Sequence, residues 1–269
     1  KLEKIRAGIK KNKNVLELAV NAARVGATVG EISDAMEEVW DRHKADVTLI
    51  KNTYANNEGS KWMLLTSAWG FAVFFGVIVA GQFSGAHLNP AVTLGMAISN
   101  KFAWSLVPEY IITQILGSIF ASVIVYIFYI DHIKATENEI TIKKCFSTTP
   151  AIRNFKNNFF SEFVASFFLV FLIFFIAKPT IKIEGIETLQ YGIGSMESLP
   201  VGILVWGLGM SLGGTTGYAI NPARDLGPRI IYNLLRGKKA KADWSYAWIP
   251  AMAPIVGGLI AGVVYVYII

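Results

Sequence analysis

Long apolar segments alternate with shorter polar segments along most of this chain. Continuous apolar runs lie at residues 62–81, 104–130, 159–177 and 248–269, and a shorter, glycine-rich run lies at residues 199–212. A helix needs about 20 apolar residues to cross the hydrocarbon core of a bilayer, so these runs predict five membrane-spanning helices. The first long apolar run begins only after residue 60, and the sequence therefore predicts no cleavable signal peptide.

Two further segments are too short to span a membrane, and each begins with the tripeptide Asn-Pro-Ala. The two copies are Asn89-Pro90-Ala91 and Asn221-Pro222-Ala223. Aligned at their 132-residue separation, residues 85–98 and 217–230 are identical at seven of fourteen positions, which indicates an internal repeat. Asn is a favoured N-cap and Pro is favoured at the first helical position, so each tripeptide predicts an abrupt helix start. A helix of about ten residues is about 15 Å long, half of the hydrocarbon thickness of about 30 Å.

Half-helices of this kind have a direct chemical consequence if their N-termini meet at mid-membrane. Two positive dipole ends and two Asn amides then lie in one place. Such a place donates hydrogen bonds to a passing water or hydroxyl group and repels protons and cations. One Asn-Pro-Ala is compatible with an ordinary turn before a helix, but two copies in a repeat between apolar spans predict a pore for small uncharged solutes.

The composition agrees with a multi-pass membrane protein. Hydrophobic residues make up 53% of the 269 residues and charged residues 16%, which is too apolar for an ordinary soluble domain. The net charge of +6 comes mostly from loops and from the N-terminal segment, so it does not indicate nucleic-acid binding. The single cysteine, Cys145, allows no internal disulfide and provides no metal site. We therefore expect no metal, no cofactor and no catalytic residues.

From residue 47 to residue 269 the chain resembles the aquaporin and glycerol-facilitator family, and within it the aquaglyceroporin branch. The strings SGAHLNPAVT at residues 84–93 and GYAINPARDLGP at residues 217–228 carry this resemblance. It implies an all-α membrane protein, built as an inverted repeat with two re-entrant half-helices. It also implies a passive channel for glycerol and water in the cell membrane, rather than an enzyme, and a homotetramer in the lipid bilayer.

The resemblance assigns the narrowest ring of the pore, its selectivity filter, to four residues. They are Trp69, Gly209, Tyr218 and Arg224. A guanidinium offers several fixed donors to polyol hydroxyl groups and repels cations, while two aromatic faces suit a carbon chain. Water-selective relatives resemble one another in having His at the position of Gly209, so Gly209 is expected to leave room for that carbon chain.

Two more sets of residues follow from the same resemblance. The pore-lining carbonyl groups are expected at Gly85, Ala86, His87, Gly217, Tyr218 and Ala219. The residues expected to brace the re-entrant loops are Glu162, Gln114 and Asp225. Irregular backbone at membrane depth needs such partners because no water is present there to accept its hydrogen bonds. His87 is expected to be structural and pore-lining, without a metal.

The chain departs from the family near its N-terminus. The family has six spans, and subtracting the repeat separation from residues 159–177 places the first span at residues 27–45. This stretch carries seven charged residues. Each charge costs about 2.5 to 3.5 kcal/mol near the centre of a membrane helix, so the stretch is not expected to cross a membrane. The first span is therefore expected to be missing.

Residues 1–46 are instead expected to form a soluble helical hairpin. Two capping-box signatures support it, one at Asn14 and Glu17 and the other at Thr28 and Glu31. We therefore expect a domain boundary near residue 46. The channel domain then covers residues 47–269 and lacks the first span.

Residues 14–43 are similar to the end of the substrate-binding domain of methylmalonyl-CoA mutase, which suggests a fusion near Asp46. Asp41 and His43 match part of a cobalamin-ligating pattern. Coincidence explains that match better than a cobalamin enzyme fragment does, because the mutase's cobalamin-binding domain and barrel are absent. The main alternative to a conducting channel is a channel-derived scaffold that displays the N-terminal helices and conducts nothing.

Overall fold

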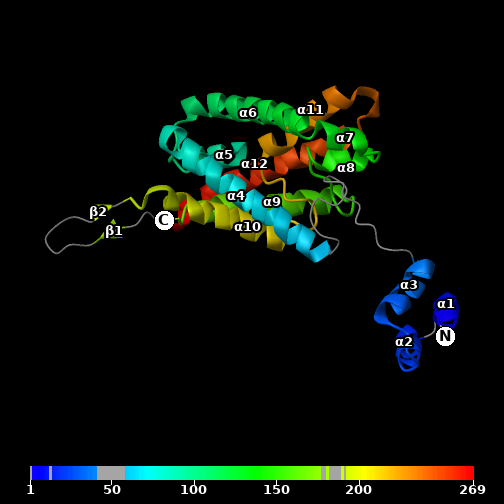
Figure 1. The fold of residues 1–269 in the computed structure, drawn as a ribbon. Coiled ribbons are helices and arrows are strands. Elements are labelled where there is room, and N and C mark those ends of the chain that lie inside the picture. The colour runs from blue at the N-terminus through cyan, green and yellow to red at the C-terminus, as the bar shows by residue number, and fades with distance from the viewer. Residues whose placement is uncertain (1, 12–13, 41–57, 177–179, 182–188, 191) are drawn as a thin grey trace. The chain divides into compact units, whose positions relative to one another are not determined.

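The structure is a computed structural model of the chain, and it describes residues 2–11, 14–40, 58–176, 180–181, 189–190 and 192–269 (Figure 1). The chain divides into two compact units, Lys1–Val47 and Thr48–Ile269.

The N-terminal unit contains three short helices, α1 (Leu2–Lys10), α2 (Val15–Ala23) and α3 (Val29–Trp40). Asn14 caps α2 through a 3.4 Å hydrogen bond from the Glu17 amide. At the start of α3, the Thr28 amide donates to the Glu31 carboxylate at 2.8 Å and the Glu31 amide donates to the Thr28 hydroxyl at 3.2 Å. The structure adds α1 to the expected hairpin, because Ile5 on α1 is fully buried in the small core of this unit.

Five helices of the described residues are long and apolar enough to cross a membrane. They lie in α4 (Glu58–Ser84), in α6 (Val107–Phe128) with the preceding turn η1 (Trp104–Leu106), in α9 (Phe155–Ile173), in α10 (Leu199–Leu212) with the preceding turn η2 (Gly194–Ser198), and in α12 (Trp244–Ile268). Large apolar side chains such as Phe75 on α4 and Phe120 on α6 are exposed, 57% and 68% respectively. Exposed apolar faces on every span are the surface that lipid requires. The predicted five spans are confirmed.

The remaining elements are shorter. The two half-helices are α5 (Pro90–Ile98) and α11 (Pro222–Arg236), and α11 is 15 residues long, longer than the expected ten or so. The connections contain η1 (Trp104–Leu106), α7 (Ile130–Ala135), α8 (Glu139–Lys144), η2 (Gly194–Ser198) and η3 (Gly237–Lys239). Among the described residues, β structure is limited to one antiparallel pair of two-residue strands, β1 (Thr180–Ile181) and β2 (Leu189–Gln190). The all-α fold class is confirmed.

The second unit is built around a pseudo-two-fold axis. Helices α4 and α10 lie side by side. At their crossing, a Cβ on Gly70 would lie 2.8 Å from the Gly202 carbonyl oxygen, and a Cβ on Gly202 would lie 2.8 Å from the Gly70 carbonyl oxygen. These two glycines are 132 residues apart, which is the separation of the two tripeptides. Half-helix α5 packs against α12, and its counterpart α11 packs against α6. The internal repeat is therefore also a structural repeat.

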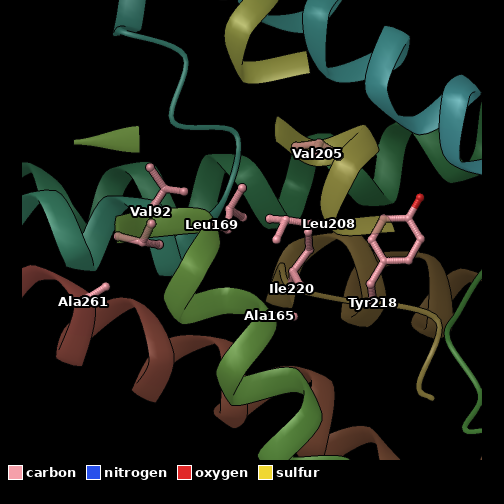
Figure 2. Packing of buried hydrophobic residues seen from close by; sticks show 9 residues of the cluster. Val92, Ala165, Leu169, Val205, Leu208, Tyr218, Ile220 and Ala261 are labelled. Atoms are coloured by element: carbon pink, nitrogen blue, oxygen red, sulfur yellow. The ribbon is translucent and has the colours of Figure 1, made fainter. Parts of the chain in front are cut away.

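The core of this unit surrounds the re-entrant loops (Figure 2). Its buried side chains come from α5, α9, α10, α12 and the loop before α11. In Figure 2, Leu208 and Ile220 lie between Leu169 and the ring of Tyr218. This packing fixes the second loop between α9 and α10.

Candidate pore and selectivity filter

The two tripeptides meet in the structure and hold each other in place. The side-chain amide of Asn89 donates to the Ile220 carbonyl at 2.8 Å, and that of Asn221 donates to the Leu88 carbonyl, also at 2.8 Å. Each Asn Oδ1 also accepts from the amide two residues further on, at 2.9 Å and 3.0 Å. Each of the two Asn side chains therefore caps its own half-helix and also holds the opposite re-entrant loop. The two helix N-termini face each other as the sequence predicted.

Both re-entrant loops contain non-glycine residues in the left-handed backbone region. The φ values are +49° for Ala86 and +52° for Leu88 in the first loop, and +37° for Tyr218 and +43° for Ile220 in the second. These positions correspond under the 132-residue repeat. Each costs about 1–3 kcal/mol, so the loops need surrounding interactions to hold them.

Glu162 on α9 supplies such an interaction to the second loop. Its two carboxylate oxygens accept hydrogen bonds from the amides of Ala219 at 2.9 Å and Ile220 at 2.8 Å. The side chain is only 1% exposed. A buried carboxylate is tolerated here because backbone N–H groups saturate it.

The first loop has a different arrangement. Under the 132-residue repeat, the backbone amides of Ala219 and Ile220 correspond to those of His87 and Leu88. Neither of these two amides has a hydrogen-bond acceptor among the described residues. Gln114 on α6 donates to the Thr93 hydroxyl at 3.0 Å, and His87 Nδ1 lies 3.1 Å from the same hydroxyl. Gln114 Oε1 is buried and has no partner in the described part of the chain. Gln114 thus holds α5 rather than the loop backbone.

Two cavities meet at the predicted filter. A vestibule of about 710 Å³ lies on the side of α8, and its wall includes the free Cys145. A channel cavity of about 320 Å³ runs along the two tripeptides. Trp69 and Arg224 line both of them, so the boundary lies at these two residues. The guanidinium carbon of Arg224 lies 4.3 Å from the centre of the Trp69 ring, a cation–π contact.

The structure places Gly209 behind the filter, against Tyr218. A Cβ on Gly209 would lie 2.7 Å from Cζ of the Tyr218 ring. The Gly209 carbonyl accepts a 3.1 Å hydrogen bond from the indole of Trp62, which also contacts Tyr218 edge-on at a centroid distance of 6.1 Å. The room that Gly209 leaves is therefore filled by the tyrosine ring. Sequence reasoning did not identify Trp62.

The expected pore-lining loop residues lie along the cavities. Gly85, Ala86, His87, Tyr218 and Ala219 line the channel cavity, and Gly217 lines the vestibule. The direction of their carbonyl groups stays a prediction.

Asp225 forms part of a buried ion pair with Arg229, and sequence reasoning missed Arg229. Both side chains are fully buried, and their closest charged atoms are 2.8 Å apart. Asp225 also accepts from the Thr148 amide at 2.7 Å and from its hydroxyl at 2.6 Å. Arg229 donates to the carbonyls of Thr148 and Ala242. The pair ties α11 to the connections before α9 and before α12. The Asp–Arg spacing of four on a helix was a usable signal.

A second ion pair joins α11 to α8. Arg236 at the end of α11 pairs with Glu139 at the start of α8. This hydrogen bond from Arg236 holds the pKa of the Glu139 carboxyl below its ordinary value.

An inverted repeat of lipid-facing spans, with two half-helices meeting at a solute-sized cavity, defines a membrane channel of the re-entrant-helix class. The family model described as Major intrinsic protein matches residues 26–265. The chain belongs to the major intrinsic protein family. It is therefore a multi-pass membrane channel protein and not an enzyme.

Three similar proteins illustrate the range of relatives. The chain is 42% identical over 218 residues to a glycerol uptake facilitator protein of Streptococcus pneumoniae, covering 81% of this chain and 88% of that protein. It is 40% identical over 219 residues to a D/L-lactic acid transporter of Lactiplantibacillus plantarum, covering 80% and 85%. The solved aquaglyceroporin of Plasmodium falciparum is 31% identical and matches with a TM-score of 0.68, covering 81% of this chain and 86% of that one.

The comparisons give no support to a mutase-like fragment. The family model begins at residue 26, within the stretch 14–43 that was expected to be foreign. Asp41, His43 and the expected junction near Asp46 lie outside the described residues.

Proposed function

We propose that this chain forms a passive pore for glycerol and water. The observation that carries the proposal is the reciprocal bonding of Asn89 and Asn221 beside a filter where the Arg224 guanidinium faces Trp69. Within the described residues, no hydrogen bond or ion pair occupies the Arg224 guanidinium. Its donors are therefore free to meet a solute hydroxyl.

The lining of the channel cavity suits a polyol. One part of the wall is apolar and includes Val73, Leu169 and Val205, while another consists of the irregular loops and the two tripeptides. We propose that carbonyl groups of these loops accept hydrogen bonds from the solute hydroxyls while the CH groups face the apolar wall. A ladder of acceptors opposite an apolar wall distinguishes a polyol from an ion.

Stopped-flow light scattering of proteoliposomes that contain the full chain tests this function. Glycerol equilibration should be at least tenfold faster than in empty liposomes, and water equilibration should also be faster. Glycerol flux no faster than in empty liposomes would contradict the proposal and favour the non-conducting scaffold.

A second substrate class is favoured by Arg224, whose guanidinium has no ion pair within the described part of the chain, and by the lactic acid transporter among the relatives. A guanidinium at the constriction attracts a small carboxylate as well as a hydroxyl group. Uptake of radiolabelled lactate into the same vesicles should be faster than into empty vesicles if this class is transported. Glycerol flux without faster lactate entry would confine the pore to uncharged solutes.

We further propose that residues 1–46 form a separate soluble unit rather than a membrane span. Its support is the small core around Ile5, the capped helices and the exposed Arg6–Glu38 ion pair at 2.5 Å.

The homotetramer expected from the family resemblance stays a prediction, which light scattering on the detergent-solubilised protein would test.

A further inference from the structure

The aromatic ring of Tyr218 at the filter is held by packing rather than by a hydrogen bond. Its hydroxyl is buried and has no hydrogen-bond partner in the described part of the chain. In Figure 2 this hydroxyl points away from Leu208 and Ile220. The backbone at Tyr218 also has a φ of +37°, an unfavourable conformation for a residue other than glycine. Because no hydrogen bond fixes the ring, its position depends on the residues that touch it.

The spans α4 and α10 form a slot around the hydroxyl end of the ring. A Cβ on Gly209 of α10 would lie 2.8 Å from the Tyr218 hydroxyl and 2.9 Å from the methyl carbon of Thr66 on α4. The Thr66 side chain is fully buried. A Cβ on Gly213, at the end of α10, would lie 2.7 Å from Cδ1 of the Tyr218 ring. The ring therefore has no room to move further toward either span.

The indole of Trp62 covers the same ring on the vestibule side. Trp62 lines the vestibule but not the channel cavity, whereas Tyr218 lines the channel cavity but not the vestibule. The indole N–H donates to the Gly209 carbonyl at 3.1 Å, and Cζ2 of the indole would lie 2.7 Å from a Cβ on Gly213. The two rings meet edge to face, with 6.1 Å between their centroids. Trp62 is thus held by the two glycines that form the slot, and it separates the filter ring from the vestibule.

We propose that Trp62 is a positioning residue that sets the width of the filter, an inference that rests on the proposed function as a polyol pore. The indole keeps the Tyr218 ring from tilting toward the vestibule, away from Trp69 and Arg224. It thereby limits the size of the solute that passes these residues. Trp62 lies outside the channel cavity, so its effect on selection passes through Tyr218.

The size of the solutes that pass measures this role. Proteoliposomes that carry the full chain are tested for permeability to glycerol and to erythritol, a polyol one carbon longer. A fitted site discriminates one carbon unit by about tenfold or more, so Trp62→Leu, which removes both the donor and the ring, should raise the erythritol-to-glycerol permeability ratio about threefold or more. Trp62→Phe keeps an aromatic edge without the donor and should raise the ratio less. A merely structural defect would lower both permeabilities together and leave the ratio unchanged.

Trp206→Phe is the matched control for Trp62→Phe. Trp206 lies on α10, and its buried indole N–H has no hydrogen-bond partner among the described residues. It lines neither the vestibule nor the channel cavity. The substitution therefore removes no hydrogen bond, and the ratio should stay at the wild-type value. Adding Trp62→Leu to a Tyr218→Ala chain should also leave the ratio of that chain unchanged, because the ring through which Trp62 acts is gone.

A fluorine label on the ring reports its position without any flux. With Tyr218 alone replaced by 3-fluorotyrosine, the fluorine NMR resonance should shift or split in Trp62→Leu and stay unchanged in Trp206→Phe. An unchanged resonance in Trp62→Leu would overturn the proposal, and so would an unchanged erythritol-to-glycerol ratio in a conducting Trp62→Leu chain. Wild-type glycerol flux no faster than in empty liposomes would contradict the proposed function instead, and the resonance would still decide whether Trp62 positions the ring.

Discussion

Arg224 is the residue on which charge selection at the filter depends. One unit charge at about 4 Å in an effective dielectric near 20 corresponds to about 4 kcal/mol. Arg224→Val should therefore raise proton or cation leak at least tenfold while leaving the water path open. Ion leak across vesicles under an imposed potential measures this effect. Lys144→Val, which removes a positive charge from the vestibule but not from the filter, should leave leak unchanged. Unaltered leak in a conducting Arg224→Val protein would place Arg224 outside the pore.

Gly209 sets the position of the Tyr218 ring. Gly209→Ala would put a Cβ 2.7 Å from that ring and 2.9 Å from the Thr66 methyl, so the ring must move into the channel cavity that it lines. Overpacking of this kind costs about 1–3 kcal/mol. We expect glycerol flux to fall about tenfold and water flux to fall less. Adding Tyr218→Ala, which removes the ring without a β-branched side chain at this positive φ, should restore glycerol flux, and Gly207→Ala should have no effect. Equal losses for glycerol and water would show that the ring does not select.

The sequence allowed the two Asn-Pro-Ala helix starts to be predicted, but not the side chains that support the residues around them. The twin tripeptides mark a helix start by local chemistry alone, so Asn89 and Asn221 are identifiable without a structure. Trp62 is different, because its indole acts on Gly209, which is 147 residues away. No local pattern encodes that contact.

At the scale of elements, the buried pair of Asp225 and Arg229 holds α11 to two connections. Breaking a buried pair from one side costs about 3–5 kcal/mol, because it leaves the other charge uncompensated. Arg229→Met should therefore lower the unfolding midpoint in detergent strongly, and adding Asp225→Asn should recover part of the loss. Arg153→Met removes the half-exposed partner of Asp243 and should cost about 0–1 kcal/mol. Equal effects of Arg229→Met and Arg153→Met would show that the buried pair is not structural.

The contact between α8 and α11 should depend on pH. The pKa of Glu139 is lowered from the ordinary value of 4.5 by the hydrogen bond from Arg236. A lowered pKa means that the ionised carboxylate stabilises the folded state above pH 4.5, and that this stability is lost as the pH falls through the lowered pKa. The unfolding midpoint should fall less between pH 5 and pH 3 in Glu139→Gln than in the wild type. Glu137→Gln is the exposed control, and an identical pH profile for all three proteins would contradict the assignment.

Element lengths were less predictable than element types. The sequence predicted a half-helix of about ten residues after Asn221, whereas α11 has 15 and continues through Pro228. The Asp225–Arg229 pair bridges the turn that contains this proline. Local helix propensity does not predict that tertiary interaction.

At the scale of the whole molecule, the inverted repeat was the most predictable feature. The 132-residue separation of the tripeptides also relates Gly70 to Gly202, which touch at the pseudo-two-fold axis. The charge of residues 27–45 argues against a membrane span there, and their assignment to a separate soluble unit stays a prediction.

The central claim is that solute passes through the channel cavity between the two tripeptides, and a plug within that cavity tests it most directly. Ala72 on α4 lines the channel cavity, whereas the adjacent Phe71 lies outside it, against α10. The measurement is glycerol permeability of proteoliposomes that carry the wild type, Ala72→Trp or Phe71→Trp at equal protein density. We predict that Ala72→Trp reduces permeability to the level of empty vesicles and that Phe71→Trp stays within twofold of the wild type. Undiminished glycerol flux through folded Ala72→Trp would contradict the account.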